Sequence, residues 1–439
     1  SGTLRKTTGS GVGVVGVVLT NGASGTVQVD AGTLRFDDGG RLDGTFVAGA
    51  GTVVAFNGGT FTYVPPNRFT GSGQYQLTGG TLQGLDDYLA NLQLVGGTVY
   101  LSPSYQTNGW IVRLDLNGAT LAGANAVSGV LNFNSGYIAG PVTVRSNGVF
   151  NWNAGRLAQA SSLTVQSNGL VNRGSGGGKD LGGPMSNYGR VVWTGGTFYV
   201  MNDNNTWLGT VVNLGVWEMQ GDLGLYQWFG NDFGTFANGG RFLKTAGTGI
   251  GVINLPFLNA SGILDVLTGT LRFDHGQQLD GSYVAEGGGV IQFNGGTFIC
   301  TPSTWLTGAG LFQLTGGTLV GLADFLPNLQ SLGGTVSLSP NYQTNGVIVR
   351  LDLNGATLAG ANQVSGVLNF NSGFISGPLT VSSNGVLNWN GGRFAQGSSL
   401  FVASNGLVNL QTGGEKDLGG AMTNYGTVAW TGGPLYLMN

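Results

Sequence analysis

The sequence has few charges, one cysteine and one histidine, and each shortage argues against a class of function. Only 8% of the 439 residues are charged, with 17 Lys and Arg against 20 Asp and Glu. Nucleic-acid binding needs a concentrated basic surface, which 17 scattered basic residues do not provide. Cys300 is alone and cannot form an internal disulfide, and His275 would need converging partners for a triad or a zinc site. No apolar run approaches the length of a membrane span.

Glycine, in contrast, is abundant, and it points to a chain of short strands. The sequence contains 85 glycines and is 41% hydrophobic. The absence of a G-x-y period excludes collagen. Many β-branched and aromatic residues, with glycine at steady intervals, predict short strands joined by tight turns. The chain begins at Ser1 with no signal-peptide pattern, so we expect it to be a processed product or an excerpt.

A long internal repeat organises the whole chain. The segment IVRLDLNGATLAGAN at 111–125 recurs 237 positions later, at 348–362. The block 32–202 matches 269–439 without a gap, and residues 4–15 match 242–253 after a one-residue slip. Only the stretch 203–237 has no second copy. The sequence therefore predicts two long tandem repeats in one continuous solenoid, residues 1–237 and an incomplete 238–439.

A short repeat lies inside the long one. GVLNFNSGYI at 129–138 and GVFNWNAGRL at 148–157 share the template Gly-x-apolar-x-apolar. This alternation is typical of a strand with one buried and one solvent-exposed face. The template starts at positions 129, 148, 169 and 189, which are about 20 residues apart. Coils of that length stack into a parallel β-helix, and one long repeat would advance the stack by about 50 Å.

The template also assigns side chains to the inside and outside of each coil. The third position after the strand glycine is asparagine in successive coils, so we expect a ladder of amides on the outer face. The predicted ladder residues are Asn132, Asn151 and Asn172, with Asn369, Asn388 and Asn409 in the second repeat. The predicted core residues are Phe133, Trp152, Trp193, Trp217, Trp389 and Trp430. Arg173 departs from the template, and because Leu410 is its counterpart we place this position at a strand end.

Corners and loops have their own signals. Gly-Gly-Thr and Ser-Asn-Gly recur after the strands, and Asn and Gly tolerate the positive φ that sharp corners require. Stacked Ser-Asn-Gly corners would let their amides bond along the solenoid. LDDYLANLQ at 85–93 has one apolar face, but its copy at 322–330 contains Pro327. We therefore expect a short helical turn or a bulging loop there, and another loop at 63–69.

Candidate catalytic groups do not converge in the sequence. Asp37–Asp38 and Asp86–Asp87 are adjacent pairs, which point to opposite faces on a strand. The second repeat changes both pairs, and the Arg113–Asp115 pair suits a surface ion pair. The segment GGRLDG at 39–44 does not match the calcium-binding GGxGxDx repeat. We therefore expect no catalytic residue, no cofactor and no metal site.

Four tryptophans fall outside the template, namely Trp110, Trp207, Trp228 and Trp305. Exposed aromatic rings stack on sugar rings or on another chain. Trp110 becomes Val347 in the second repeat, so a regular sugar-binding comb is not predicted.

The residues also resemble a known group of proteins. GGRFLKTAGTGIGVINLPFLNASGILDVLTGTLRF at 239–273 and SNGVFNWNAGRL at 146–157 are similar to very large secreted bacterial repeat proteins. These include filamentous-haemagglutinin-like adhesins and autotransporter-type passenger domains. The resemblance implies a right-handed parallel β-helix, export to the cell surface, and a role in adhesion or an extracellular fibre. It implies no catalytic residue.

The sequence thus favours a non-enzymatic, extracellular structural protein, a segment of a β-solenoid fibre or adhesin stalk. Its expected partners are other copies, end to end or side by side, and surface glycans, with neither nucleic acid nor a membrane span. The alternatives are a carbohydrate-active β-helix enzyme, a lyase or hydrolase, and a solenoid that binds glycans or ice.

Overall fold

The computed structural model describes residues 2–65, 68–174, 176–411 and 413–438, and these residues form strands, turns and loops without a helix. The strands pair in parallel from one coil to the next. This confirms the predicted fold class, a right-handed parallel β-helix with coils of about 20 residues. The chain divides into two compact units, Ser1–Gln220 with Leu225–Phe236 (unit 1) and Gly221–Gly224 with Ala237–Asn439 (unit 2). Each unit is described by itself.

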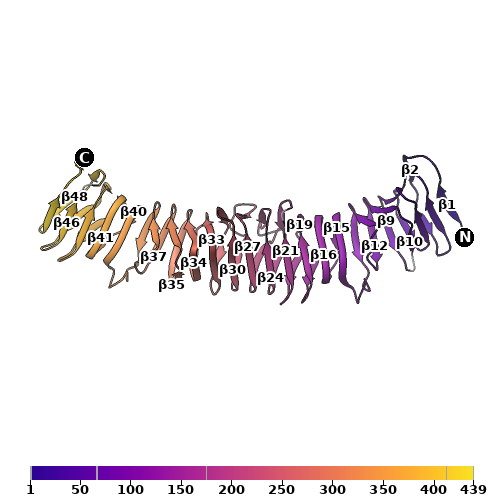
Figure 1. Cartoon of the computed structure of the whole chain (residues 1–439), viewed down its shortest axis with the longest axis horizontal. Helices are drawn as coiled ribbons and strands as arrows, with labels where there is room; N and C mark the ends of the chain where they lie inside the picture. The colour runs from indigo at the N-terminus through magenta and orange to yellow at the C-terminus, as the bar shows by residue number, and fades with distance from the viewer. Residues whose placement is uncertain (1, 66–67, 175, 412, 439) are drawn as a thin grey trace. The chain divides into compact units, whose positions relative to one another are not determined.

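In unit 1, side chains lie directly above their counterparts one coil away. Leu131 pairs with Phe150, which pairs with Val171, which pairs with Val191. The apolar template positions therefore stack into one continuous buried column, and the residues between them face outward. Figure 1 shows the stacking of the strands in this column. They are β16 (Asn125–Ile138), β18 (Val149–Trp152), β21 (Leu170–Arg173) and β24 (Arg190–Trp193).

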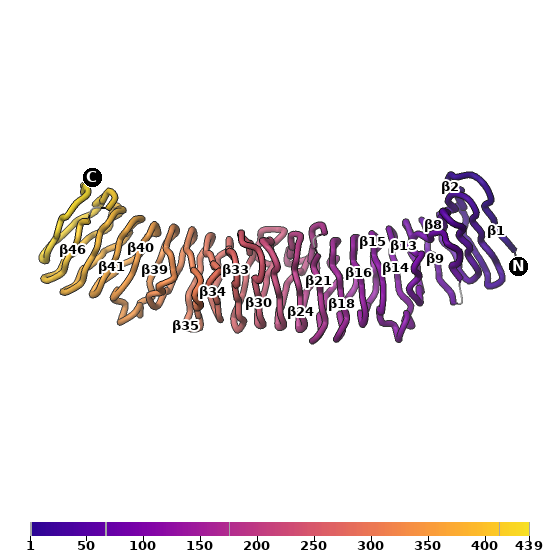
Figure 2. The backbone as a smooth tube through the Cα atoms, in the orientation of Figure 1, coloured from indigo at the N-terminus to yellow at the C-terminus, as the bar shows by residue number. Residues whose placement is uncertain are grey.

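Each coil contributes strands to two further columns, so the core is closed on three sides. The backbone turns sharply between the strands of one coil (Figure 2). The second column contains β17 (Pro141–Val144), β20 (Ser162–Val165), β23 (Pro184–Asn187) and β26 (Thr210–Asn213). The third contains β19 (Gly155–Leu157), β22 (Lys179–Leu181) and β25 (Phe198–Val200).

Unit 2 rebuilds the same coils from the second long repeat. Leu368 pairs with Leu387, which pairs with Val408, which pairs with Val428. These are the positions 237 residues after the column of unit 1. The strands that carry them are β41 (Asn362–Ile375), β43 (Val386–Trp389), β46 (Leu407–Leu410) and β49 (Thr427–Trp430).

The corners depend on residues that accept positive φ. The asparagines of the Ser-Asn-Gly corners have φ between 61° and 67°, in the left-handed region that asparagine tolerates. Their contacts differ from the prediction: Ser146 Oγ donates to the carbonyl of Ser167 (2.8 Å), and the Asn147 backbone N–H donates to the carbonyl of Asn168 (3.1 Å). Hydroxyl and backbone groups, not side-chain amides, therefore join these corners.

The segments with the helix-like pattern are loops. Residues 86–91 connect β12 (Thr81–Leu85) to β13 (Leu92–Leu94). Residues 323–328 connect β37 (Thr318–Leu322) to β38 (Leu329–Ser331). The bulging-loop alternative is therefore correct, and the apolar spacing serves to cover the coil beneath. Of the loop predicted at 63–69, residues 66 and 67 lie outside the described residues.

Candidate functional site

Asparagines form a hydrogen-bonded ladder on the outer face of each unit, at the positions chosen from the sequence. In unit 1, Asn132 Nδ2 donates to Asp115 Oδ1 (2.5 Å), Asn151 to Asn132 (2.7 Å) and Asn172 to Asn151 (2.9 Å). In unit 2, the same chain runs from Asp352 through Asn369, Asn388 and Asn409, at 2.6, 2.7 and 2.9 Å. Each ladder therefore starts on a carboxylate, which accepts but does not donate.

A second, shorter ladder runs beside the first and was not predicted. It joins Asn117, Asn134 and Asn153 in unit 1, each step at 2.8 Å. Its counterpart joins Asn354, Asn371 and Asn390, each step at 2.7 Å. The signal was present in the sequence, because Asn134 and Asn153 follow the first ladder by two residues and so share its face.

An asparagine inside the ladder should contribute more to the stability of the fold than an asparagine at its end. Asn151 both donates and accepts, so Asn151→Ala leaves one donor and one acceptor of its neighbours unpaired. We expect a loss of about 2 kcal/mol, against about 1 kcal/mol for Asn172→Ala, which removes a single bond. Native-state hydrogen exchange of the β18 and β21 amides measures both. Equal losses for the two variants would contradict a ladder that acts through its paired amides.

Aromatic side chains fill the core at the predicted template positions. Phe133, Trp152, Trp193 and Trp217 are fully buried, and Trp389 is 1% exposed. Trp430 corrects the prediction, because it is 60% exposed. It has the inward register, opposite Leu410, but no described strand covers its other face. In unit 1, by contrast, β27 (Val216–Gln220) covers Trp193.

Arg173 is the least expected residue of the core. It ends β21, in agreement with the predicted strand end, yet its side chain is completely buried. The guanidinium carbon lies 3.7 Å from the ring centroid of Phe198 and 4.7 Å from that of Trp193. Trp152 and Trp217 complete an aromatic cage around it. None of its three side-chain nitrogens has a hydrogen-bond partner, and burial lowers the pKa of Arg173 well below its usual value.

Buried lysines, which the sequence reading missed, hold the glycine-rich loops. Lys179 Nζ donates to the carbonyls of Gly176 (3.4 Å), Gly177 (3.0 Å) and Gly195 (3.3 Å). Burial, with a smaller contribution from the charge of Arg173, lowers the pKa of Lys179 to about 8. Its counterpart Lys416 donates to Gly414 (3.0 Å). The signal was a lysine close behind a glycine run in both repeats: Lys179 follows Gly178 directly, and only Glu415 separates Lys416 from its glycine run. A buried ammonium needs such carbonyl acceptors.

Most carboxylates in the candidate pairs are engaged by arginine or by loop groups. Arg35 Nε and Nη2 each donate to Asp37 at 2.8 Å, and this hydrogen bonding lowers the pKa of Asp37. Arg113 lies 3.7 Å from Asp115. Asp86 differs, because burial raises its pKa. Within the described ranges, no three His, Cys, Asp or Glu side chains gather as a metal site would require.

His275 and Cys300 lie apart from any such cluster. His275 Nδ1 is 2.7 Å from the carbonyl oxygen of Gly276. Cys300 is partly buried, and burial raises its pKa to about 12. A thiol with that pKa is almost entirely protonated near neutral pH and is a poor nucleophile.

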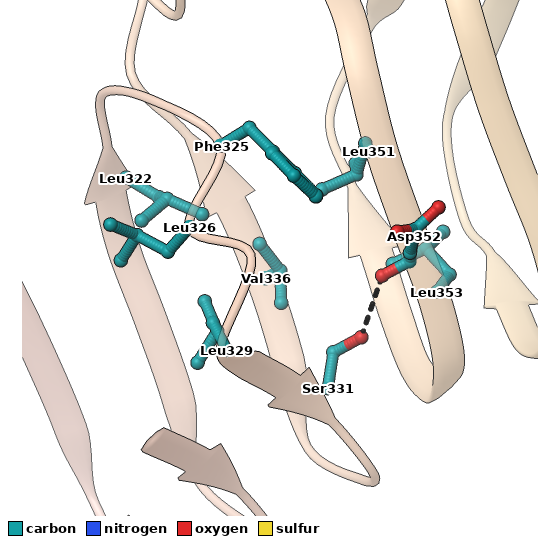
Figure 3. Close-up of a pocket in the computed structure, with 9 residues that line it drawn as sticks. All are labelled: Leu322, Phe325, Leu326, Leu329, Ser331, Val336, Leu351, Asp352 and Leu353. Carbon is teal, nitrogen blue, oxygen red and sulfur yellow. Dashed lines mark hydrogen bonds between the residues drawn. The ribbon is translucent and has the colours of Figure 1, made fainter. Parts of the chain in front are cut away.

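A small cavity lies under the loop at 323–328. Its volume is about 20 Å³, and Phe325, Leu326 and Leu329 surround it (Figure 3). Ser331 Oγ reaches across to the carbonyl of Asp352 (3.1 Å). In unit 1 the position of Ser331 is held by the buried Leu94. The cavity has room for about one water molecule.

Comparisons with known proteins give no family. No family model, no curated protein and no solved structure matches the chain. Among the residues that the structure describes, none belongs to a helix long and apolar enough to cross a membrane. The site must therefore be interpreted from its own geometry.

Proposed function

We propose that this chain is a segment of an extracellular, non-enzymatic β-solenoid, part of a fibre or an adhesin stalk. The observation that supports the proposal is that the same ladder recurs in both units. Each unit builds an Asp-Asn-Asn-Asn ladder with steps of 17, 19 and 21 residues. Repeating complete coils adds length at nearly constant stability per coil. An enzyme needs one well-made site, and copying the outer ladder does nothing for such a site.

The charged residues support the same proposal. Arg156 Nη2 lies 2.8 Å from Asp180, and its counterpart Arg393 lies 2.9 Å from Asp417. Arginine and carboxylate come from neighbouring coils and so tie one coil to the next. Polysaccharide lyases and hydrolases instead need carboxylates that are free to accept or donate a proton.

Electron microscopy of the natural full-length protein tests the proposal. We expect filaments or stalks at the cell surface, with an axial period of about 50 Å for each long repeat. Surface labelling of intact cells should modify the protein. Compact, monodisperse particles confined to the cell interior would contradict it. Cleavage of pectin or alginate in the presence of calcium would favour the enzyme alternative.

A further inference from the structure

An open groove on unit 1 has the size and lining of a ligand site. Its volume is about 510 Å³, within the range of small-molecule sites. It lies where β14 (Thr98–Leu101) and β15 (Trp110–Ala122) meet the start of β16, beside the loop at 102–109. The side chains that matter for its chemistry are Tyr100, Ser102, Asn108, Trp110, Asn125 and Thr143.

The two repeats differ at this groove more than around it. Residues 98–148 and their counterparts at 335–385 differ at only eight positions. Four of the eight lie at the groove: three line it, and Arg145 covers a ring of its wall. The second repeat has Ser337, Val347, Gln363 and Ser382 where the first has Tyr100, Trp110, Ala126 and Arg145. Three of the changes lie on β14, β15 and β16, and the fourth lies directly after β17 (Pro141–Val144). Together they alter one surface while the fold stays the same.

The altered residues combine a flat ring with a cation. Tyr100 is 43% exposed and lines the groove. The guanidinium carbon of Arg145 lies 4.0 Å from the ring centroid of Trp110. This cation–π contact holds the arginine in place. Arg145 forms no ion pair with any carboxylate of the described residues, so its charge is available to a ligand.

Polar groups shared by both repeats complete the lining. Asn125 Nδ2 donates to the carbonyls of Ala122 (3.2 Å) and Gly123 (2.9 Å), which fixes the amide at the groove floor. Its Oδ1 accepts no hydrogen bond from the described residues. Asn108 is exposed at the rim, in a loop that the Gly109 N–H to Tyr105 carbonyl bond holds (3.1 Å). An amide held as that of Asn125 is suits vicinal hydroxyl groups, and the exposed amide of Asn108 can donate to or accept from them.

We propose that this groove binds an acidic oligosaccharide, a short run of sugar rings that carry carboxylate or sulfate groups. The apolar face of a sugar ring stacks on Tyr100. The hydroxyl groups bond to Asn108, Asn125 and Ser102, and the acidic group pairs with Arg145 in bidentate geometry. The proposal depends on the groove alone and holds whether or not the chain belongs to a fibre.

Isothermal titration calorimetry of the full chain tests the ligand class. The probes are tetragalacturonate, a heparin-derived tetrasaccharide and neutral maltotetraose. We expect one site per chain for at least one acidic probe, with affinity at least about tenfold above that of maltotetraose. Binding that weakens with added salt is also expected. Equal affinity for the neutral probe, or no binding of either acidic probe at millimolar concentration, overturns the proposal.

The second repeat supplies the variants. Y100S/W110V/R145S installs residues that the equivalent positions of unit 2 already hold, so we expect an unchanged fold by circular dichroism and at least a tenfold loss of affinity. Y137F is the matched control, since it is also a repeat-to-repeat difference but lies outside the groove. The reverse graft, S337Y/V347W/Q363A/S382R, should raise the stoichiometry from one site to two. Undiminished binding by the triple variant would overturn the proposal.

Discussion

Replacing Arg173 by leucine is expected to stabilise unit 1 by about 3 kcal/mol, although it removes every cation–π contact of the aromatic cage. Isolating a charge from water costs several kcal/mol even after relaxation. Each buried N–H without a partner adds to this cost, and the three guanidinium nitrogens have none. The closest cation–π contact, to Phe198, returns about 2 kcal/mol. The three longer contacts each return less, and we expect the four together not to offset the cost. Leucine removes the cost and keeps most of the apolar contact.

The second repeat indicates that leucine fits. Leu410 occupies the equivalent position, 2% exposed, in register with Trp389 on one side and Trp430 on the other. Urea unfolding and hydrogen exchange of the β21 and β24 amides measure the change. Arg173→Met preserves more of the side-chain volume and should also stabilise, which separates loss of charge from creation of a cavity. Leu410→Arg should destabilise unit 2. A lower unfolding midpoint for both Arg173 variants would show that the cage is net stabilising.

The titration of Lys179 offers an independent readout. Its pKa of about 8 is lowered chiefly by burial and secondarily by the charge of Arg173, so Arg173→Leu should raise it. Lys416, whose pKa is lowered by burial alone, is the control and should not move. Because the folded pKa of Lys179 lies below its unfolded value, the folded state binds fewer protons. Unit 1 should therefore gain stability as the pH rises through 8 towards the unfolded value, and gain less in the variant.

The sequence predicted what depends on period and spacing. Alternation predicted which side chains face inward, and the recurrence of the template at intervals of about 20 residues predicted which asparagine lies above which. The state of Arg173 depends instead on which rings the neighbouring coils bring to it, and no local pattern contains that information. The groove could not be predicted for a similar reason. Tyr100, Trp110 and Arg145 are far apart in the repeat template, and the pairing of β14, β15, β16 and β17 brings them to one surface.

Trp430 should become buried if a further coil is added. The test joins a copy of residues 203–220 after residue 439, so that the copied strands can pair with β48 (Ala421–Asn424) and β49. In unit 1 the original segment lies on β23 and β24 and leaves Trp193 without exposed surface. Trp430 Nε1 already donates to Gly433 (2.9 Å), as Trp193 Nε1 donates to Gly196 (2.9 Å). Its side chain is therefore in place for a covering coil.

The expected gain is about 4 kcal/mol, because covering the exposed 60% of a tryptophan removes roughly 150 Å² of apolar surface from water at about 25 cal/mol per Å². Trp430 fluorescence, obtained by difference from Trp430→Phe, should shift to shorter wavelength and resist quenching by acrylamide.

A matched extension with serine at the copies of Trp217 and Met219 keeps the length but lacks the covering side chains, and it should give neither effect. A Trp430 that stays quenchable in the full extension would contradict coil-on-coil burial as the source of stability. If the gain appears, each coil is stabilised by the next one, and length itself becomes a stabilising property of the solenoid.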